Sequence, residues 1–358
     1  LITRPGANTS VEVVRAIVEL AREAKAKEVK IGEGAGIMGK IVKMETIFRE
    51  LGYKTMAEDT DSTLVDFDLD EKSMVKVPSG VAFKEIPVPK TVLASDTIIN
   101  VPVLKVNITA TFSGAIKNFL GILPREWKKK AHLLGIHQAL VDIAKVVRPS
   151  LVVMDAIVGI EGLSGRKGNP VRLDTVVAGR NSAAVDSVAL RVVDCNPDNV
   201  SHVKLASEQG IGPIESEKIK IVGTPISEVR RRIKFPPTEP KTVEQIKLIT
   251  GNLEKCQACI MPYSVAISLM DMAGELSRVK EMTILVGPDI GLPDKSEIRG
   301  KLVMVGECLR KYEKQASNLE GVFIPCCPPP GTIIMDTIRL LSGIIAEPTE
   351  YMQEWNSL

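Results

Sequence analysis

The 358-residue sequence contains few aromatic residues and almost no excess charge. Aromatic residues make up 4% of the chain, which leaves few side chains that could stack on the bases of a single-stranded nucleic acid. The formal net charge of +2 creates no overall field that would attract nucleic acid or an anionic membrane. No apolar run approaches the ~18–20 residues that a membrane-spanning helix needs. We therefore expect neither nucleic acid nor a membrane among the partners.

The sequence motifs of several well-known enzyme classes are also missing. The chain has no nucleophile elbow, no phosphate-binding P-loop, no zincin helix and no complete glycine fingerprint for dinucleotides. A short glycine turn, Gly34-Ala35-Gly36, is typical of a tight connection between a strand and a helix. No signal-peptide pattern opens the chain, and we expect a cytoplasmic protein.

Short apolar runs alternate with amphipathic stretches along the whole chain. This alternation predicts an α/β fold with mostly parallel, doubly wound sheets. The chain is longer than the ~250–300 residues at which a single hydrophobic core stops growing, so we expect two domains with a cleft between them. A basic, proline-rich segment over residues 229–242 predicts the linker. It separates a first domain over residues 1–228 from a second, cysteine-containing α/β domain over residues 243–358.

Local patterns predict several elements that bear on the candidate sites. They are a helix from Ser10 to about Ala26, a helix from about His132 to Val147, strands over Leu151–Met154 and Lys218–Val222, and a helix from Val243 to about Leu276 that is interrupted by cysteines. The lysine run that follows Trp127 is expected to form a solvated face.

The stretch from Ala94 to Gly121 combines a buried strand with a polar segment. Its polar side chains include Lys105, Asn107, Ser113, Lys117 and Asn118. Open α/β folds hold their ligands just beyond the carboxyl ends of buried strands. We therefore predict a site for a small anionic ligand here, with the two lysines as catalytic groups and the amides and the serine as ligand contacts.

Asp155 is a third candidate catalytic residue. It directly follows the expected strand Leu151–Met154 and precedes a glycine-rich polar loop over residues 159–168. A carboxylate at the carboxyl end of a strand is well placed to meet a ligand. The alternative is that Asp155 accepts hydrogen bonds from backbone amides of its own loop.

Five of the six cysteines lie in the last third of the chain. Cys256 and Cys259 form a pair at two-residue spacing, whereas Cys308 and the pair Cys326-Cys327 each follow a strand and precede a helix. The carboxyl ends of parallel strands open on one edge of a sheet, so we expect these segments to converge. Four thiolates from Cys256, Cys259, Cys308 and Cys327 would suit an iron–sulfur cluster or zinc.

Two other interpretations of the cysteines stay open. They could form a thiol redox site, or they could be reduced, buried residues without chemistry. Cys327 is preferred over Cys326 as a ligand because Pro328 follows it, as proline follows the last cysteine of a ferredoxin-type motif. Cys195 stands alone before Asn196-Pro197 and is expected to be structural.

Four segments of the chain closely resemble one protein family. The segments IINVPVLKVN, SGAIKNFLG, MDAIVGIEG and VAGRNSAAVD are similar to the family called domain of unknown function 362, over about Thr3 to Val222. Many members of that family carry a ferredoxin-like, cysteine-rich segment, so the resemblance implies an iron–sulfur protein. The C-terminal cysteines are similar to the cysteine-rich tail of some relatives. The resemblance implies no particular reaction.

A more distant resemblance is to the nickel-pincer lactate racemases. It is carried by Thr3-Arg4-Pro5 and by Asn107, Ser113-Gly114 and Lys117. It implies that Arg4 holds a substrate carboxylate, that Lys117 carries the pincer cofactor, and that His132 lies near the place of a nickel ligand. However, Asn107 replaces one catalytic histidine, and the turn at Gly34 lacks the other. An amide has no pKa suited to taking an α-proton, so we expect no standard lactate racemisation.

We therefore predict a protein with a cysteine-bound iron–sulfur cluster, or zinc or nickel, that performs redox or Lewis-acid chemistry. Arg4, Lys105, Lys117 and Asn118 are expected to hold the anionic ligand, and an electron-transfer partner is expected. The first alternative is an isomerase on the nickel-pincer scaffold with altered catalytic residues. The second is a non-catalytic metal or cofactor carrier. The sequence does not choose between an oxidoreductase and an isomerase.

Overall fold

The chain divides into two compact units. The computed structural model describes residues 3–36, 42–163, 167–253, 256 and 258–356, and side chains up to residue 353. Leu1–Lys128 and His137–Phe235 form the first unit, whereas Lys129–Ile136 and Pro236–Leu358 form the second. The main division at Phe235 falls within the residues 229–242 that the sequence assigns to a linker. Nothing in the sequence pattern predicts that residues 129–136 belong to the second unit.

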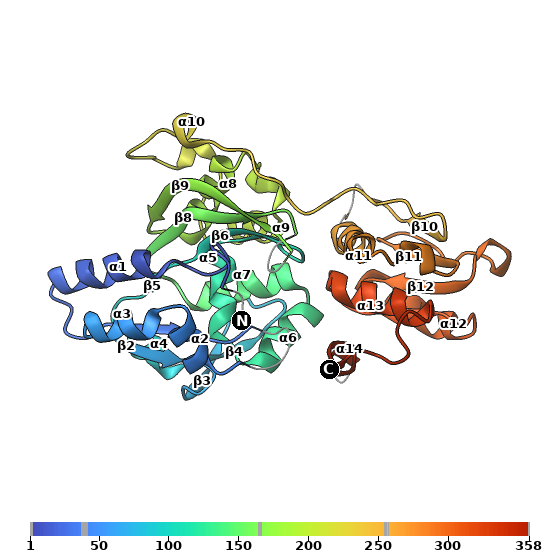
Figure 1. Cartoon of the computed structure of the whole chain (residues 1–358), viewed down its shortest axis with the longest axis horizontal. Coiled ribbons are helices and arrows are strands. Elements are labelled where there is room, and N and C mark those ends of the chain that lie inside the picture. The colour runs from blue at the N-terminus through green and yellow to red at the C-terminus, as the bar shows by residue number, and fades with distance from the viewer. Residues whose placement is uncertain (1–2, 37–41, 164–166, 254–255, 257, 357–358) are drawn as a thin grey trace. The chain divides into compact units, whose positions relative to one another are not determined.

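The first unit contains most of the strands and helices (Figure 1). Its helices are α1 (Val11–Glu23), α2 (Met44–Glu50), α3 (Tyr53–Asp59), α4 (Lys90–Ala94), α5 (Ala115–Asn118), α8 (Ser182–Val192), α9 (Ser201–Glu208) and α10 (Ile226–Val229). The segment that belongs to the second unit includes the C-terminal part of α6 (Arg125–Leu133) and the first residue of α7 (Ile136–Val146). Its strands are β1 (Lys30–Glu33), β2 (Thr63–Asp66), β3 (Lys72–Lys76), β4 (Glu85–Pro89), β5 (Ile99–Asn100), β6 (Val103–Asn107), β7 (Thr111–Ser113), β8 (Leu151–Glu161) and β9 (Asn169–Gly179).

The main sheet of the first unit is organised around the long strand β8. Strands β5 and β6 pair with β8 in parallel, and β7 pairs with β6 antiparallel. The long strand β9 pairs with β8 antiparallel, and Figure 1 shows the two lying side by side. Two smaller sheets complete the unit, the parallel pair β1–β2 and the antiparallel pair β3–β4.

The position of Asp155 differs from the prediction. Strand β8 does not end at Met154 but continues to Glu161, because β9 pairs with it along nearly its whole length. Asp155 therefore lies in the middle of a strand, opposite Val176, and not at a carboxyl end. The first part of the expected glycine-rich loop is strand, and residues 164–166 lie outside the described part.

Two other expected elements also differ in the structure. The single helix from His132 to Val147 is two helices, α6 and α7, because Gly135 between them has a φ of +103° that a helix cannot include. Residues 219–222 form no strand, and Val222 is 83% exposed, since no neighbouring strand covers it. The predicted helix at Ser10 is confirmed as α1, whose N-cap hydroxyl accepts a hydrogen bond from the Val13 amide.

The second unit is built on one parallel sheet. Its strands β10 (Ile246–Thr250), β11 (Met282–Val286), β12 (Lys301–Val305) and β13 (Val322–Ile324) lie in chain order. Its helices are α11 (Ile260–Met272), α12 (Glu313–Ser317), α13 (Gly331–Leu341) and α14 (Glu350–Asn356), together with the short 3₁₀ helix η6 (Glu307–Tyr312). Strand β10 replaces the helix expected from Val243, because its apolar residues pair with the buried strand β11. The α/β fold with mostly parallel sheets is confirmed.

Apolar side chains of this sheet alternate between two cores. Ile284 and Val303 point into the larger core with α11 and α13, whereas Leu285 and Met304 point into a smaller core with Leu309 and Ala316 of η6 and α12. The sheet is thus covered on both faces, which explains why its strands are continuous apolar runs.

Candidate functional site

A cavity of about 1000 Å³ lies inside the first unit. Its walls come from α1, α2, β1 and the segment from Thr91 to Val103, and they combine apolar and polar side chains in similar measure. Lys105, Asn118, Asn100 and Glu33 add polar groups to this lining. A cavity that offers both apolar surface and polar groups able to orient a ligand can serve as a small-molecule site. Of the predicted ligand-binding residues, Lys105 and Asn118 line this cavity.

Lys105 is held by backbone contacts at the cavity wall. Its Nζ donates a hydrogen bond of 2.5 Å to the carbonyl oxygen of Ala7. An ammonium group has three donors, so two more are not used by the described residues and could bind a ligand. Across the β6–β7 pair, Lys105 stands directly opposite Ser113. The Ser113 Oγ is buried and has no hydrogen-bond partner among the described residues, so this hydroxyl could form a further hydrogen bond.

Two side chains from distant elements position the helix that carries Lys117 and Asn118. The Asp186 carboxylate on α8 accepts hydrogen bonds from the amides of Ala115 and Ile116 at the start of α5, at 2.6 and 3.0 Å. The Asn100 amide donates to the Ala115 carbonyl oxygen and accepts from the Asn118 side chain, both at 2.8 Å. These bonds fix a four-residue helix that could not form alone.

Lys117 is half-buried and does not line the cavity. Burial, together with the positive charges of Lys105 and Lys128, lowers its pKa to about 8. Roughly a tenth of the Lys117 amine is therefore neutral at pH 7.

Glu33 and Lys128 belong to the same charged region, although neither was predicted there. Glu33 is the last residue of β1 and lines the cavity, and burial of its carboxyl group raises its pKa. The charges of Lys128 and Lys105 oppose that rise. Lys128 is only 3% exposed, and its Nζ donates to the Ala35 carbonyl oxygen at 2.6 Å. The lysine run after Trp127 is thus not simply a solvated face.

Gly34 allows these groups to approach one another. A Cβ atom at this position would lie 2.3 Å from the carbonyl oxygen of Gly121 and 2.9 Å from the Nζ of Lys128. Any side chain would therefore push the end of β1 away from the segment after α5. The position of Glu33 at a strand end was the signal that could have identified it.

The other residues predicted for this site bind the backbone instead. Arg4 is exposed and donates to the carbonyl oxygen of Gly168. The Asn107 Oδ1 accepts from the amides of Thr109 and Ala110, which closes the β6–β7 turn. The buried Asp155 carboxylate accepts from the amides of Ser10 and Ile157. None of these three residues lines the cavity, and their contacts are those of structural residues.

Two histidines form a buried stack elsewhere in the first unit. The rings of His137 and His202 lie 5.9 Å apart and are nearly parallel. Burial lowers the pKa of His137 to about 4, and burial together with His137 and Lys117 lowers that of His202. Both rings are therefore neutral at neutral pH.

The second unit gathers cysteines at the carboxyl edge of its sheet. Cys308 follows β12, Cys326 and Cys327 follow β13, and Cys259 is the N-cap residue of α11. Burial raises the pKa of the Cys259 thiol, and Cys327, Cys308, Cys256 and Cys326 raise it further. The Cys327 pKa is raised to about 11 by burial and then by Cys256 and Cys308. The four predicted ligands thus lie within electrostatic range of one another.

Gly306 at the end of β12 faces two of these thiols. A Cβ atom here would lie 2.8 Å from the Sγ of Cys259 and 3.7 Å from that of Cys308, and the backbone has a φ of +107°. Glycine is therefore required both by the conformation and by the closeness of the sulfur atoms. These two requirements explain the glycine in the G-x-C pattern of the sequence.

The adjacent residues Cys326 and Cys327 have different surroundings. Cys326 is fully buried, and its thiol donates a hydrogen bond to the carbonyl oxygen of His132. Cys327 is exposed. Among the described residues, no three His, Cys, Asp or Glu side chains are already grouped as a closed metal site.

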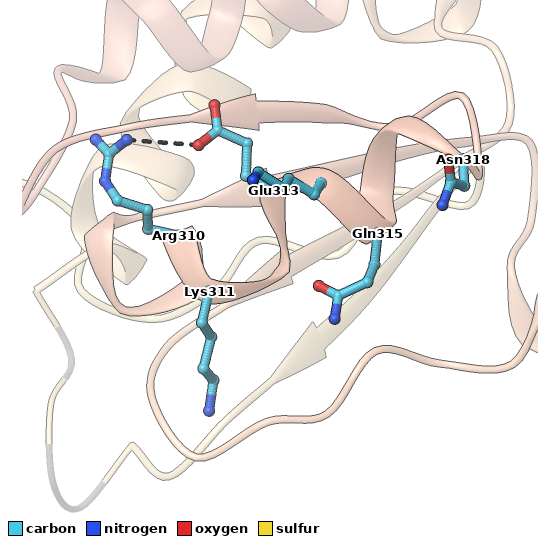
Figure 2. Close-up of a pocket in the computed structure, with 6 residues that line it drawn as sticks. Arg310, Lys311, Glu313, Gln315 and Asn318 are labelled. Carbon is cyan, nitrogen blue, oxygen red and sulfur yellow. Dashed lines mark hydrogen bonds and ion pairs between the residues drawn. The ribbon is translucent and has the colours of Figure 1, made fainter.

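A shallow depression of about 450 Å³ also lies in the second unit (Figure 2). Figure 2 shows that its lining consists of polar side chains from η6 and α12, with an ion pair of 3.5 Å between Arg310 and Glu313. Arg310 also pairs with Glu307. Without an apolar wall to bury a ligand, this depression does not have the form of a small-molecule site.

Comparison with known proteins identifies the family. The family model "Domain of unknown function (DUF362)" matches residues 3–191, which is more than half of the chain. The protein belongs to this family. It is also 24% identical over 222 residues to the thylakoid-associated protein sll1697 of Synechocystis sp., a match that covers 60% of this chain and 64% of that protein. The chain thus spans somewhat less than two thirds of this relative.

The match to the family model includes the cavity-lining residues and the segment from Ala94 to Gly121. It ends before the cysteines of the second unit. Among the helices that the structure describes, none combines the length and the apolar character that a membrane crossing requires.

Proposed function

We propose that this protein binds an iron–sulfur cluster through Cys256, Cys259, Cys308 and Cys327, and a small anionic ligand beside Lys105 and Asn118. The observation that carries the first part is the convergence of four thiols from three segments at one sheet edge, with Gly306 in close contact with two of them. A donor set made only of thiolates suits an iron–sulfur cluster and, as an alternative, zinc.

The surroundings of the last two cysteines support Cys327 as the fourth ligand. Its thiol is exposed and lies within electrostatic range of Cys256 and Cys308, whereas the Cys326 thiol donates a hydrogen bond to the His132 carbonyl oxygen. The backbone of Cys326 has a φ of +116°, a conformation that residues other than glycine rarely adopt. Such strain is often found at functional positions.

The anion site is supported by the charges around the cavity. Among the described residues, Lys105 uses one of its three donors, and Lys117 and Lys128 add positive charge nearby, against Glu33 and Asp68. A bound cluster would supply one-electron transfer. The chain's own residues would hold the ligand anion at Lys105 and orient Asn118 through Asn100. An electron-transfer partner is part of this proposal.

One observation favours the alternative of an isomerase on a nickel-pincer scaffold. The lowered pKa of Lys117 provides a neutral amine that could attach a cofactor covalently. Against it, the Asn107 side chain is occupied by two backbone amides, and Arg4 binds a backbone carbonyl. A non-catalytic carrier of a metal or cofactor would use the same cysteines without turnover.

The test is metal and sulfide analysis with a visible absorption spectrum on protein purified without oxygen. We expect a brown sample with iron and acid-labile sulfide, and a loss of colour in each of the variants C256S, C259S, C308S and C327S. The matched controls are C326S, at the neighbouring position, and C195S, in the other unit; both should keep the colour. Nickel with a mass adduct on Lys117 would support the isomerase instead. A colourless sample with free, unreactive thiols would refute every metal proposal.

A further inference from the structure

We infer that the ligand of the first unit is an elongated, largely apolar molecule that ends in a carboxylate. This inference rests on the proposed anion site at Lys105 and adds the chemical class of the ligand. The cavity volume, the pattern of its walls and the position of its charged groups each support it.

The size of the cavity exceeds the needs of a small acid. Sites for drug-sized ligands measure ~300–1000 Å³, and this cavity, at about 1000 Å³, lies at the upper end. Its lining follows the whole of α1, from Thr9 before the helix to Lys25 after it. A 13-residue helix with a rise of 1.5 Å per residue is about 20 Å long. A three-carbon hydroxy acid would leave most of this space unfilled.

The wall that α1 forms along this length carries an apolar stripe. Val14, Ile17 and Ala21 lie three and four residues apart on α1, so they form one stripe on the helix. Phe48 from α2 and Ile98 from the segment before β5 add apolar surface to the same cavity. These side chains would bury a hydrocarbon body, while polar residues such as Thr9 and Lys25 line the cavity beside the two ends of the helix.

The cationic group lies near the start of α1. The Lys105 Nζ binds the carbonyl oxygen of Ala7, four residues before the helix begins. Glu33 and Asn118 line the cavity together with Lys105. One anionic headgroup at Lys105 with a chain extending along α1 therefore matches both the charge and the shape.

The test uses calorimetric titration of the full chain with decanoate, propionate and decan-1-ol. We expect decanoate to bind at least about 100-fold more tightly than propionate, because it buries seven more methylene groups. We expect K105M to weaken decanoate binding about tenfold or more, because the charge-assisted hydrogen bond is lost.

A matched pair of variants tests whether the hydrocarbon chain of the ligand lies along α1. Ala21 lines the cavity, whereas Ala16 on the same helix is exposed and does not. We expect A21W to weaken decanoate binding at least tenfold while leaving propionate binding unchanged, and A16W to affect neither.

The outcomes separate the two claims. Equal affinities for propionate and decanoate, with no effect of A21W, would overturn the elongated ligand but leave the anion site standing. Equal affinities for decan-1-ol and decanoate, with no effect of K105M, would overturn the anion site itself. No binding of any of the three compounds to folded protein would overturn both.

Discussion

Replacing Lys117 by methionine should stabilise the first unit. Lys117 is half-buried on a helix held by Asp186 and Asn100, and its ammonium lies near the charges of Lys105 and Lys128. Methionine has a similar length and carries no charge, so the variant removes the cost of burying an ammonium group. The effect should depend on pH, which separates it from a simple packing change.

The magnitude follows from the pKa of Lys117. This pKa falls from 10.5 in the unfolded chain to about 8 in the folded protein. At 1.36 kcal/mol per pH unit, the protonated amine costs at most about 3.4 kcal/mol of folding free energy. The unfolded chain binds the proton more strongly, so the cost is complete below pH 8 and disappears as the pH rises to 10.5. The gain from K117M should therefore shrink by about 2.5 kcal/mol between pH 7 and pH 10.

Urea unfolding at a series of pH values measures this effect. A Trp355→Phe background leaves Trp127 as the only tryptophan, and Trp127 packs on Phe83 in the first unit. The matched control is Lys204→Met at an exposed position of α9, which should change stability little at any pH. The reasoning would be refuted if K117M destabilised the first unit at pH 7, or if its effect were the same at pH 7 and pH 10.

Three further variants test other parts of the structure. Gly306→Ala should lower the iron content per chain, because its Cβ would meet the Cys259 sulfur; normal iron content would contradict this. The protein should lose stability as the pH falls from 6.5 to about 4, because the neutral ring of His137 must take up a proton there when the chain unfolds. His137→Gln should reduce this loss by up to about 3 kcal/mol. An unchanged pH profile of unfolding would argue against it. Asp186→Asn should destabilise the first unit by about 1–3 kcal/mol, because the two carboxylate oxygens of Asp186 each accept one α5 hydrogen bond and asparagine has only one such oxygen. Unfolding in urea measures the loss, and an unchanged midpoint would contradict it.

The sequence was most informative where one pattern determines both an element and its end. The buried strands that precede Cys308 and Cys327 are clear apolar runs, and parallel pairing brings their ends to one edge. The N-cap at Ser10 is similarly local. In these cases no distant residue is needed to decide the outcome, so the expectation and the structure agree.

Elements that depend on a distant partner were predicted less well. Strand β8 continues past Asp155 only because β9 pairs with it, and β10 is a strand rather than a helix because β11 lies beside it. Lys128 resembles its solvated neighbours in sequence, yet tertiary packing buries it against Ala35. Asp186 appears as an ordinary helix residue, although its carboxylate fixes the start of α5. Local sequence carries no record of such contacts.

The charges of the first unit connect ligand binding to protonation. The charges of Lys105 and Lys128 lower the pKa of Lys117. The charges of Glu33 and Asp68 act to raise the pKa of Lys128. An anion bound at Lys105 would add negative charge to this group and raise the pKa of Lys117 from about 8. Binding would then take up protons near pH 8, and by linkage the affinity would fall as the pH rises above that value. A neutral ligand in the same cavity would cause no such uptake, so the proton balance of binding itself reports whether the headgroup is an anion.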